Sequence, residues 1–277
     1  MTQLSQKWKY EDIDWSLFDS SKVNPEIVRI IKAGSVIEHN GSDYGRYLNN
    51  VFENDPVLRK EIQSWSADEI KHGKVLADWV KLADPSYDFE ARFKAYVKGF
   101  PIDTQTKESI RGSCGAELLT RCMVEIGTSS FYTAVKDATD EPLLKQICAK
   151  IAADELRHYK LFYKHFQRYQ VKEQLNFFKR FKVTMSRLLL GEQDDELPFA
   201  YYIANCETAP YNRLHYTKAY SQIVYSCYKK IHIDRGMALF CKAIGTNPQG
   251  WLHKVLTYVV FKTLSLKAAK YAKAVES

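Results

Sequence analysis

The chain has 277 residues, of which 45% are hydrophobic and 26% charged, and its formal net charge is +7. This composition is ordinary for a globular protein and excludes a disordered chain, a collagen-like repeat and a disulfide scaffold. Six scattered cysteines form no CxxC pair, which excludes a zinc ribbon or rubredoxin-type site and favours a reducing compartment. Because the first residues contain no apolar stretch, we expect no signal peptide and a cytoplasmic protein.

Long periodic stretches, separated by only 12 glycines and 8 prolines, predict an all-α protein. Tight turns at Asp55-Pro56 and before Pro142, with a longer connection between them, suit two antiparallel helical hairpins joined by a crossover. That arrangement is a four-helix bundle with one long connection. The helices expected in this part of the chain cover residues 25–53, 56–82, 86–98, 107–137 and 143–169.

Residues 171–277 are again mostly helix-like and differ from the rest in charge. They hold 16 basic and 8 acidic residues, a net of +8, whereas residues 1–170 have a net charge of −1. We therefore expect two parts, a bundle over 1–170 and a basic helical extension over 171–277 packed on it. A basic surface suits nucleic acid, an anionic membrane surface or an acidic protein, and charge alone does not choose among them.

The last apolar segment, residues 251–274, is interrupted by Lys254, Lys262 and Lys267. These lysines make it too broken to span a bilayer comfortably. We expect an amphipathic helix packed on the bundle, with a membrane-surface helix as the alternative.

An internal repeat is the most informative feature of the sequence. Ala-Asp-Glu-Ile-Lys-His at 67–72 recurs as Ala-Asp-Glu-Leu-Arg-His at 153–158. The pairs Glu69/His72 and Glu155/His158 therefore each have a spacing of three residues, which places both side chains on one face of a helix. The two copies share the same frame, and each lies on the second helix of a predicted hairpin. They therefore favour a metal site over the alternative, in which both Glu-x-x-His pairs lie on solvent-exposed helix faces.

A carboxylate-bridged dinuclear metal site also needs one glutamate from each of the other two helices. Glu38 lies 31 residues before Glu69, and Glu125 lies 30 residues before Glu155. In antiparallel helices joined by a short turn, residues at that separation lie level with each other. Glu117 competes for the third-helix position but lies two turns nearer the start of that helix, so we expect Glu125. The predicted metal ligands are Glu38, Glu69, His72, Glu125, Glu155 and His158.

The charges of these ligands match two metal ions. Four carboxylates and two neutral imidazoles balance two divalent cations, and oxygen and nitrogen donors without thiolate suit iron, with manganese as an alternative. Asp68 and Asp154 precede the glutamate in each repeat, and we expect each to accept the other ring N–H of a ligand histidine unless it lies on the surface. His39 directly follows Glu38 and so points elsewhere, and we expect His165 to be structural.

At these motifs the chain resembles the soluble acyl carrier protein desaturases, which are type 2 fatty acid desaturases within the ferritin-like superfamily. The resemblance rests on residues 146–158, on Glu69-Ile-Lys-His-Gly73 and on Glu125-Ile-Gly-Thr128, and it covers about residues 25–170. It implies a ferritin-like bundle with a di-iron centre. It also implies a catalytic role for Thr128, beside the oxygen-binding face of the iron pair, whereas an ordinary helix threonine would only bond to its own preceding turn.

The resemblance implies an oxygen-activating oxidoreductase that acts on a C–H bond of a fatty acyl chain, with an acyl carrier protein or lipid substrate. Since the sequence has no flavin, NAD or iron–sulfur motif, an external electron donor such as a ferredoxin is implied. A di-iron hydroxylase, an aldehyde-deformylating oxygenase and a ferroxidase or iron-storage protein are the alternatives. No basic run with interleaved aromatics is prominent, so nucleic acid is not expected, and a homodimer and a peripheral membrane contact stay open.

Overall fold

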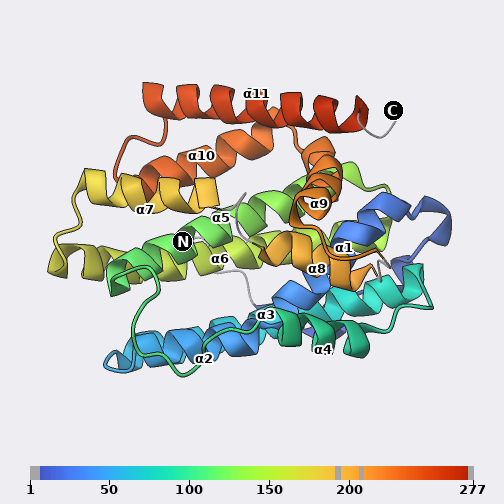
Figure 1. Cartoon of the computed structure of the whole chain (residues 1–277), viewed down its shortest axis with the longest axis horizontal. Helices are drawn as coiled ribbons and strands as arrows, with labels where there is room; N and C mark the ends of the chain where they lie inside the picture. The colour runs from blue at the N-terminus through green and yellow to red at the C-terminus, as the bar shows by residue number, and fades with distance from the viewer. Residues whose placement is uncertain (1–6, 191–194, 206–208, 274–277) are drawn as a thin grey trace.

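The computed structural model describes residues 7–190, 195–205 and 209–273, and this part of the chain contains helices and no strand (Figure 1). The all-α prediction is therefore confirmed. The helices are α1 (Pro25–His39), α2 (Gly41–Val51), α3 (Pro56–Ala83), α4 (Phe89–Gly99), α5 (Cys114–Ala138), α6 (Pro142–Lys172), α7 (Phe177–Leu190), α8 (Glu196–Ala204), α9 (Arg213–Cys227), α10 (Lys230–Ile244) and α11 (Trp251–Lys273).

Three helices of the bundle begin with the same local signal, a side-chain cap followed by proline. Asn24, Asp55 and Glu141 accept hydrogen bonds from backbone N–H groups in the first turns of α1, α3 and α6. The proline that follows each cap has a fixed φ and lacks an N–H group, which that position does not need. These caps fix where the helices that carry the site begin.

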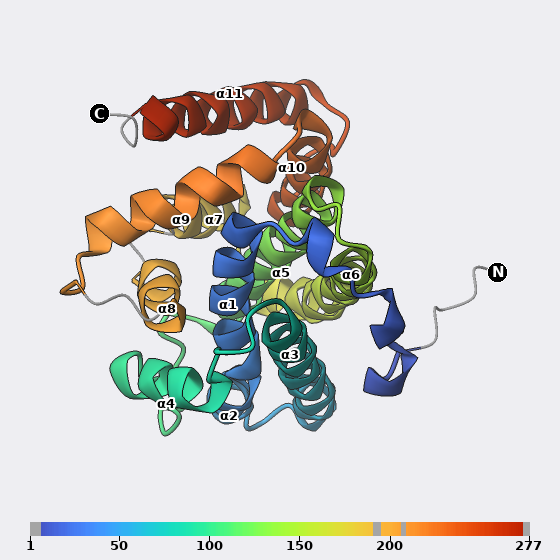
Figure 2. The ribbon, with the colours of Figure 1, turned by 90° about the vertical axis from the view of Figure 1, so that its right-hand side faces the viewer.

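Helices α1, α3, α5 and α6 form the four-helix bundle, in which α1 packs on α3 and α5 packs on α6 as two hairpins (Figure 2). Contacts between α3 and α6 join the hairpins. The crossover consists of α4 and the irregular residues 100–113. This is the ferritin-like arrangement that the turns and the repeat predict.

Two predicted boundaries were wrong. The helix expected over 25–53 is broken at Asn40, whose backbone (φ −76°, ψ 10°) leaves the helical range and separates α1 from α2. The third helix begins at Cys114 and not at 107, because Ser113 caps it and Gly112 before it has a φ of +86°. Helical periodicity runs through the first place, so it could not show that break, and residues 107–113 contain a single apolar residue, Ile110, which does not fix where the third helix begins.

Two glycines allow the helices around the site to approach closely. A Cβ atom at Gly41, in the first turn of α2, would lie 2.4 Å from the Cβ of Glu69. A Cβ atom at Gly73, directly after His72, would lie 2.4 Å from the backbone nitrogen of His39. Alanine at either position would therefore push α3 away from α1 and α2.

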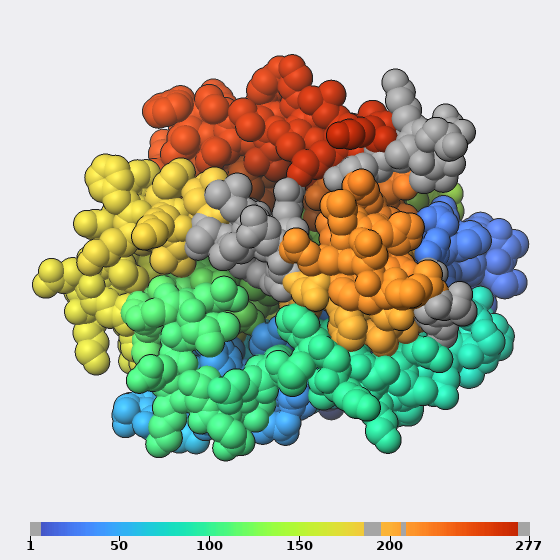
Figure 3. Space-filling model, viewed as in Figure 1, coloured from blue at the N-terminus to red at the C-terminus, as the bar shows by residue number. Residues whose placement is uncertain are grey.

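The C-terminal helices cover one side of the bundle. Helices α8 and α9 pack on α1, α7 and α10 pack on α5, and α11 lies outermost on α9 and α10. Figure 3 shows this layer, yellow to red, over the upper part of the molecule, with α4 and the α4–α5 connection below. Both apolar clusters of the core contain residues from before and after residue 170. In the described residues, every helix is too short or too polar to cross a membrane.

Candidate metal centre

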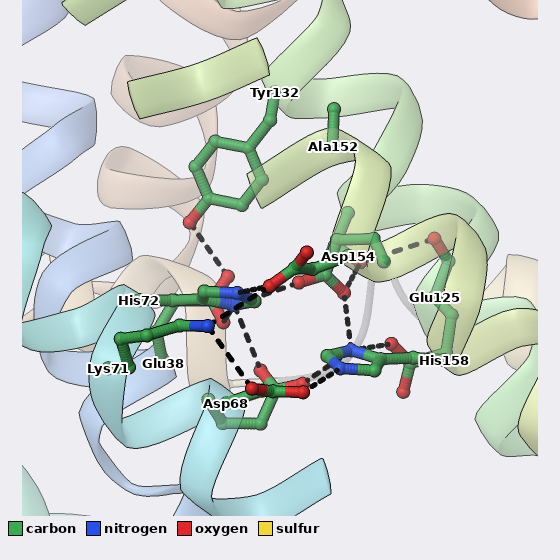
Figure 4. A network of polar contacts seen from close by, with 12 residues as sticks. Glu38, Asp68, Lys71, His72, Glu125, Tyr132, Ala152, Asp154 and His158 are labelled. Carbon is green, nitrogen blue, oxygen red and sulfur yellow. Dashed lines mark hydrogen bonds and ion pairs between the residues drawn. The ribbon is translucent and has the colours of Figure 1, made fainter. Parts of the chain in front are cut away.

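The structure brings the six predicted ligands together in the middle of the bundle (Figure 4). Each of them is at most 7% exposed. They form two groups, and within each group one donor atom from every residue lies within 4.8 Å of the others. The two groups share two glutamates and are therefore adjacent. The first consists of Glu38, Glu69, His72 and Glu155, and the second of Glu69, Glu125, Glu155 and His158.

In the part of the chain that the structure describes, donor atoms of the cluster lie close together without well-formed hydrogen bonds. Nδ1 of His72 lies 3.1 Å from Oε1 of Glu155, and Nδ1 of His158 lies 3.0 Å from Oε1 of Glu69. None of these atoms makes a well-formed hydrogen bond within the described residues, and neither does Oε1 of Glu125. Buried polar atoms are nearly always paired, so this convergence of free lone pairs fits bound cations.

Burial and mutual repulsion raise the pKa values of two carboxylates of the cluster. Burial, reinforced by the charges of Glu155 and Glu38, raises the pKa of Glu69 well above its usual range. Burial, together with the charge of Glu155, raises the pKa of Glu125 to about 8. Two divalent cations would replace the protons that these groups hold and remove the repulsion between them.

An aspartate from each repeat orients the histidine of the other repeat. Oδ2 of Asp154 lies 3.0 Å from Nε2 of His72, and Oδ2 of Asp68 lies 3.4 Å from Nε2 of His158. Each contact engages Nε2 and leaves Nδ1 of the ring facing the carboxylates. The sequence indicated the histidine–aspartate contacts but not their crossed arrangement, which follows from the packing of α3 against α6.

A group of side chains that sequence reasoning missed surrounds these aspartates. Lys71 contacts both of them, with its Nζ atom 3.1 Å from Asp68 and 3.3 Å from Asp154. The same ammonium group lies 3.9 Å from the ring centroid of Trp8, and Trp8 stacks on His72. Arg157 also pairs with Asp154. Trp8 lies in the irregular N-terminal segment, where no periodic pattern indicated a role.

Two hydroxyl groups donate to carboxylates of the cluster. Oγ1 of Thr128 lies 2.8 Å from Oε2 of Glu155 and also 3.2 Å from the backbone oxygen of Val124. The threonine thus contacts both the cluster and its own preceding turn. The hydroxyl of Tyr132 donates to Oε1 of Glu38 at 2.7 Å. Tyr132 follows Glu125 by two helical turns, and this spacing could have identified it.

Three side chains that the sequence does not assign as ligands, Glu117, His39 and His165, lie outside the cluster. Glu117 accepts hydrogen bonds from Tyr47 at 2.7 Å and from Ser109 at 2.8 Å. His39 meets the rings of Phe89 and Phe93 edge to face, and His165 contacts Glu61 at 3.1 Å.

A cavity of about 460 Å³ reaches the cluster. At one end it is lined by Thr128 and by the carboxylates of Glu38, Glu69, Glu125 and Glu155. Its further walls come from α1, α2, α3 and α5, from the connection between α4 and α5, and from Glu196 at the start of α8. Most of these wall residues are apolar or aromatic, among them Ile37, Tyr44, Tyr47, Trp65, Phe100, Pro101, Ile102, Ile110 and Val124. A largely apolar molecule could therefore extend to the ligand carboxylates.

Fold and site together define a class, namely ferritin-like helical bundles with a buried carboxylate–histidine cluster of the kind that holds metal. The model of the fatty acid desaturase family matches residues 42–239, well over half of the chain. The chain belongs to that family and is a desaturase-type oxidoreductase. The match continues past residue 170 into α10, further than the resemblance recognised in the sequence. A comparison with curated proteins gives no match.

Proposed function

We propose that this protein is an O2-dependent di-iron enzyme that desaturates a fatty acyl chain. One observation carries the proposal: two overlapping groups of buried carboxylate and imidazole donors, sharing Glu69 and Glu155, lie at the end of a largely apolar cavity. Family membership supplies the reaction class, and the donor set indicates the metal.

The donor set assigns the residues that would hold each ion. Glu38 and His72 would hold one iron and Glu125 and His158 the other, and the two shared glutamates would contact both. Oxygen and nitrogen donors without thiolate suit iron, with manganese as the alternative. When bound, the iron pair supplies the activation of O2 that breaks an unactivated C–H bond, and two external electrons are needed.

The side chains of the protein bind the substrate and keep protons in place. Apolar walls that include Ile37 and Val124 would enclose an acyl chain and exclude water from the carboxylates. Thr128 holds a proton at Oγ1 directly beside Glu155, where it can be donated during the reaction. Burial and the charge of Glu38 raise the pKa of Tyr132, which keeps this phenol protonated as a hydrogen-bond donor to Glu38.

The partners belong to the same proposal. The acyl chain would arrive on an acyl carrier protein or as a lipid, and a ferredoxin or a similar small protein would deliver the electrons. We infer a cytoplasmic location, which fits the five described cysteines, all free; Cys206 lies outside the described residues. Nucleic acid is not among the proposed partners, and a homodimer is compatible with the proposal.

Product analysis tests the function. Iron-loaded protein would be incubated with O2, a reduced ferredoxin and a saturated acyl-acyl carrier protein, and the acyl chains would then be analysed by mass spectrometry. We expect a loss of two hydrogens that requires O2 and is absent in Glu155→Ala. Hydroxylated or shortened chains would instead identify a hydroxylase or a deformylating oxygenase. Iron oxidation without any change in the acyl chain would identify a ferroxidase.

A further inference from the structure

The outermost helix, α11, has an apolar outer face. Five large apolar side chains on it are between 47% and 74% exposed, and Figure 1 shows the helix at the edge of the molecule. Their spacing of three, four or seven residues places them along one side of the helix. This outer face consists of Trp251, Val255, Tyr258, Val259 and Leu266.

The opposite side of α11 accounts for its attachment to the protein. His253 and Thr257 are buried, Leu252 and Leu256 are half-buried, and this inner side packs on α9 and α10. The helix is therefore apolar on two sides, whereas a helix that only covers a core needs one apolar side. The apolar residues of the outer face contribute little to the fold and call for another explanation.

The charge of α11 indicates what covers this face. The helix contains five lysines and no acidic residue. Lys254 and Lys270 are exposed at the borders of the outer face, and Lys262 is exposed within it. The ammonium group of Lys262 lies 5.6 Å from the ring centroid of Tyr258. The carboxylate of Asp234 meets α11 on the inner side, at His253.

We propose that α11 docks on the surface of an anionic lipid bilayer. Tryptophan and tyrosine favour the membrane–water interface, the aliphatic side chains would enter the acyl boundary, and the lysines would reach the lipid phosphates. A second copy of the chain fits less well, since pairing two such faces would bury Lys262 and bring two helices of like charge together. The inference does not depend on the metal centre.

The proposed docking leaves the cavity accessible. Outside the four bundle helices, the walls of the cavity come from α2, the α4–α5 connection and Glu196 of α8. Figures 1 and 2 show α2 and α4 on the side of the molecule away from α11. A docked molecule would therefore turn its cavity toward water. A water-soluble carrier could still deliver a substrate to it.

Vesicle binding tests the proposal with the full-length protein. We expect sedimentation with vesicles of phosphatidylcholine and phosphatidylglycerol to be at least about tenfold stronger than with phosphatidylcholine alone, and to weaken as salt rises. Trp251→Ser combined with Val259→Ser should lower binding about tenfold or more. Lys254→Gln and Lys262→Gln should each lower it about fivefold at low salt.

Matched controls come from α3. Val57 is 59% exposed and Lys60 is also exposed, so Val57→Ser and Lys60→Gln make the same chemical changes elsewhere on the surface and should leave vesicle binding unchanged. Circular dichroism would verify that every variant is folded. Equal binding to neutral and anionic vesicles, or unchanged binding of the Trp251/Val259 variant, would overturn the proposal. The proposal would also be overturned if the protein bound no vesicles but formed a dimer that the Trp251/Val259 variant dissociates. A second copy of the chain would then cover the outer face.

Discussion

The two halves of the candidate metal centre come from the same repeated motif but have different surroundings. In the first half, Glu38 accepts a hydrogen bond from Tyr132, and His72 contacts a fully buried aspartate, Asp154, at 3.0 Å. In the second half, the contact between His158 and Asp68 is longer, at 3.4 Å, and the side chain of Asp68 is 10% exposed. The repeat thus determines which side chains can donate to a metal, whereas the packing around the repeat determines how each half is hydrogen-bonded and how deeply it is buried.

The largest expected effect comes from a glutamate that both halves share. Glu155→Ala removes a donor from each group, so we expect iron to fall from about two ions per chain to none, because the remaining ligands leave both sites incomplete. Elemental analysis of purified protein checks this. Glu117→Ala removes a buried glutamate outside the cluster and serves as the control, which should keep its iron. Full iron content in Glu155→Ala would contradict the assignment.

Removal of the metal should reveal the repulsion that both halves share. In the metal-free folded protein the pKa values of Glu69, Glu125, His72 and His158 are raised. Between about pH 5 and pH 8 the folded state holds protons that the unfolded chain releases, so stability falls as pH rises across this range. We expect a loss of at least about 2 kcal/mol over this range.

Chemical denaturation of chelator-treated protein at several pH values measures this loss. Metal-loaded protein is the control, and its stability should change less over the same range because the ions have replaced the protons. A metal-free protein that gains stability from pH 5 to 8 would show that these side chains are not crowded together as described.

The two orienting aspartates should differ in importance. Replacing Asp154 by asparagine removes a charged, fully buried partner of His72, and we expect metal affinity to fall about 100-fold. Asp68→Asn changes the longer and partly exposed contact to His158 and should lower affinity about tenfold. Competition with a metal-binding dye measures both variants. The reverse order would mean that burial does not decide the strength of these contacts.

The smallest expected effect concerns the hydroxyl that only the first half has. Tyr132→Phe removes the hydrogen bond to Glu38 without opening a cavity, and we expect a loss of about 1 kcal/mol in the stability of the protein. Tyr159→Phe is a matched control, since its hydroxyl is also largely buried but donates to a backbone oxygen at 3.2 Å, away from the cluster. Only Tyr132→Phe should also change metal affinity. Equal metal affinity in both variants would show that the hydroxyl of Tyr132 does not influence metal binding.

The sequence specifies the donors of the site more clearly than their surroundings. The Glu-x-x-His repeat and the 31- and 30-residue spacings select six residues that the fold brings together, because helical rise and short turns determine which residues lie level. The break at Asn40 was missed because periodic apolar residues continue across it, and the late start of α5 was missed because residues 107–113 contain a single apolar residue and so show no period. Trp8 and Lys71 could not be assigned, since their contacts depend on how a segment without periodicity packs against α3.

Crystallographic anomalous scattering at the iron absorption edge tests the central claim most directly. The account predicts two iron peaks in each chain, one beside Glu38 and His72 and the other beside Glu125 and His158, with Glu69 and Glu155 between them. A single iron peak, or iron bound away from these six side chains in fully loaded protein, would contradict it.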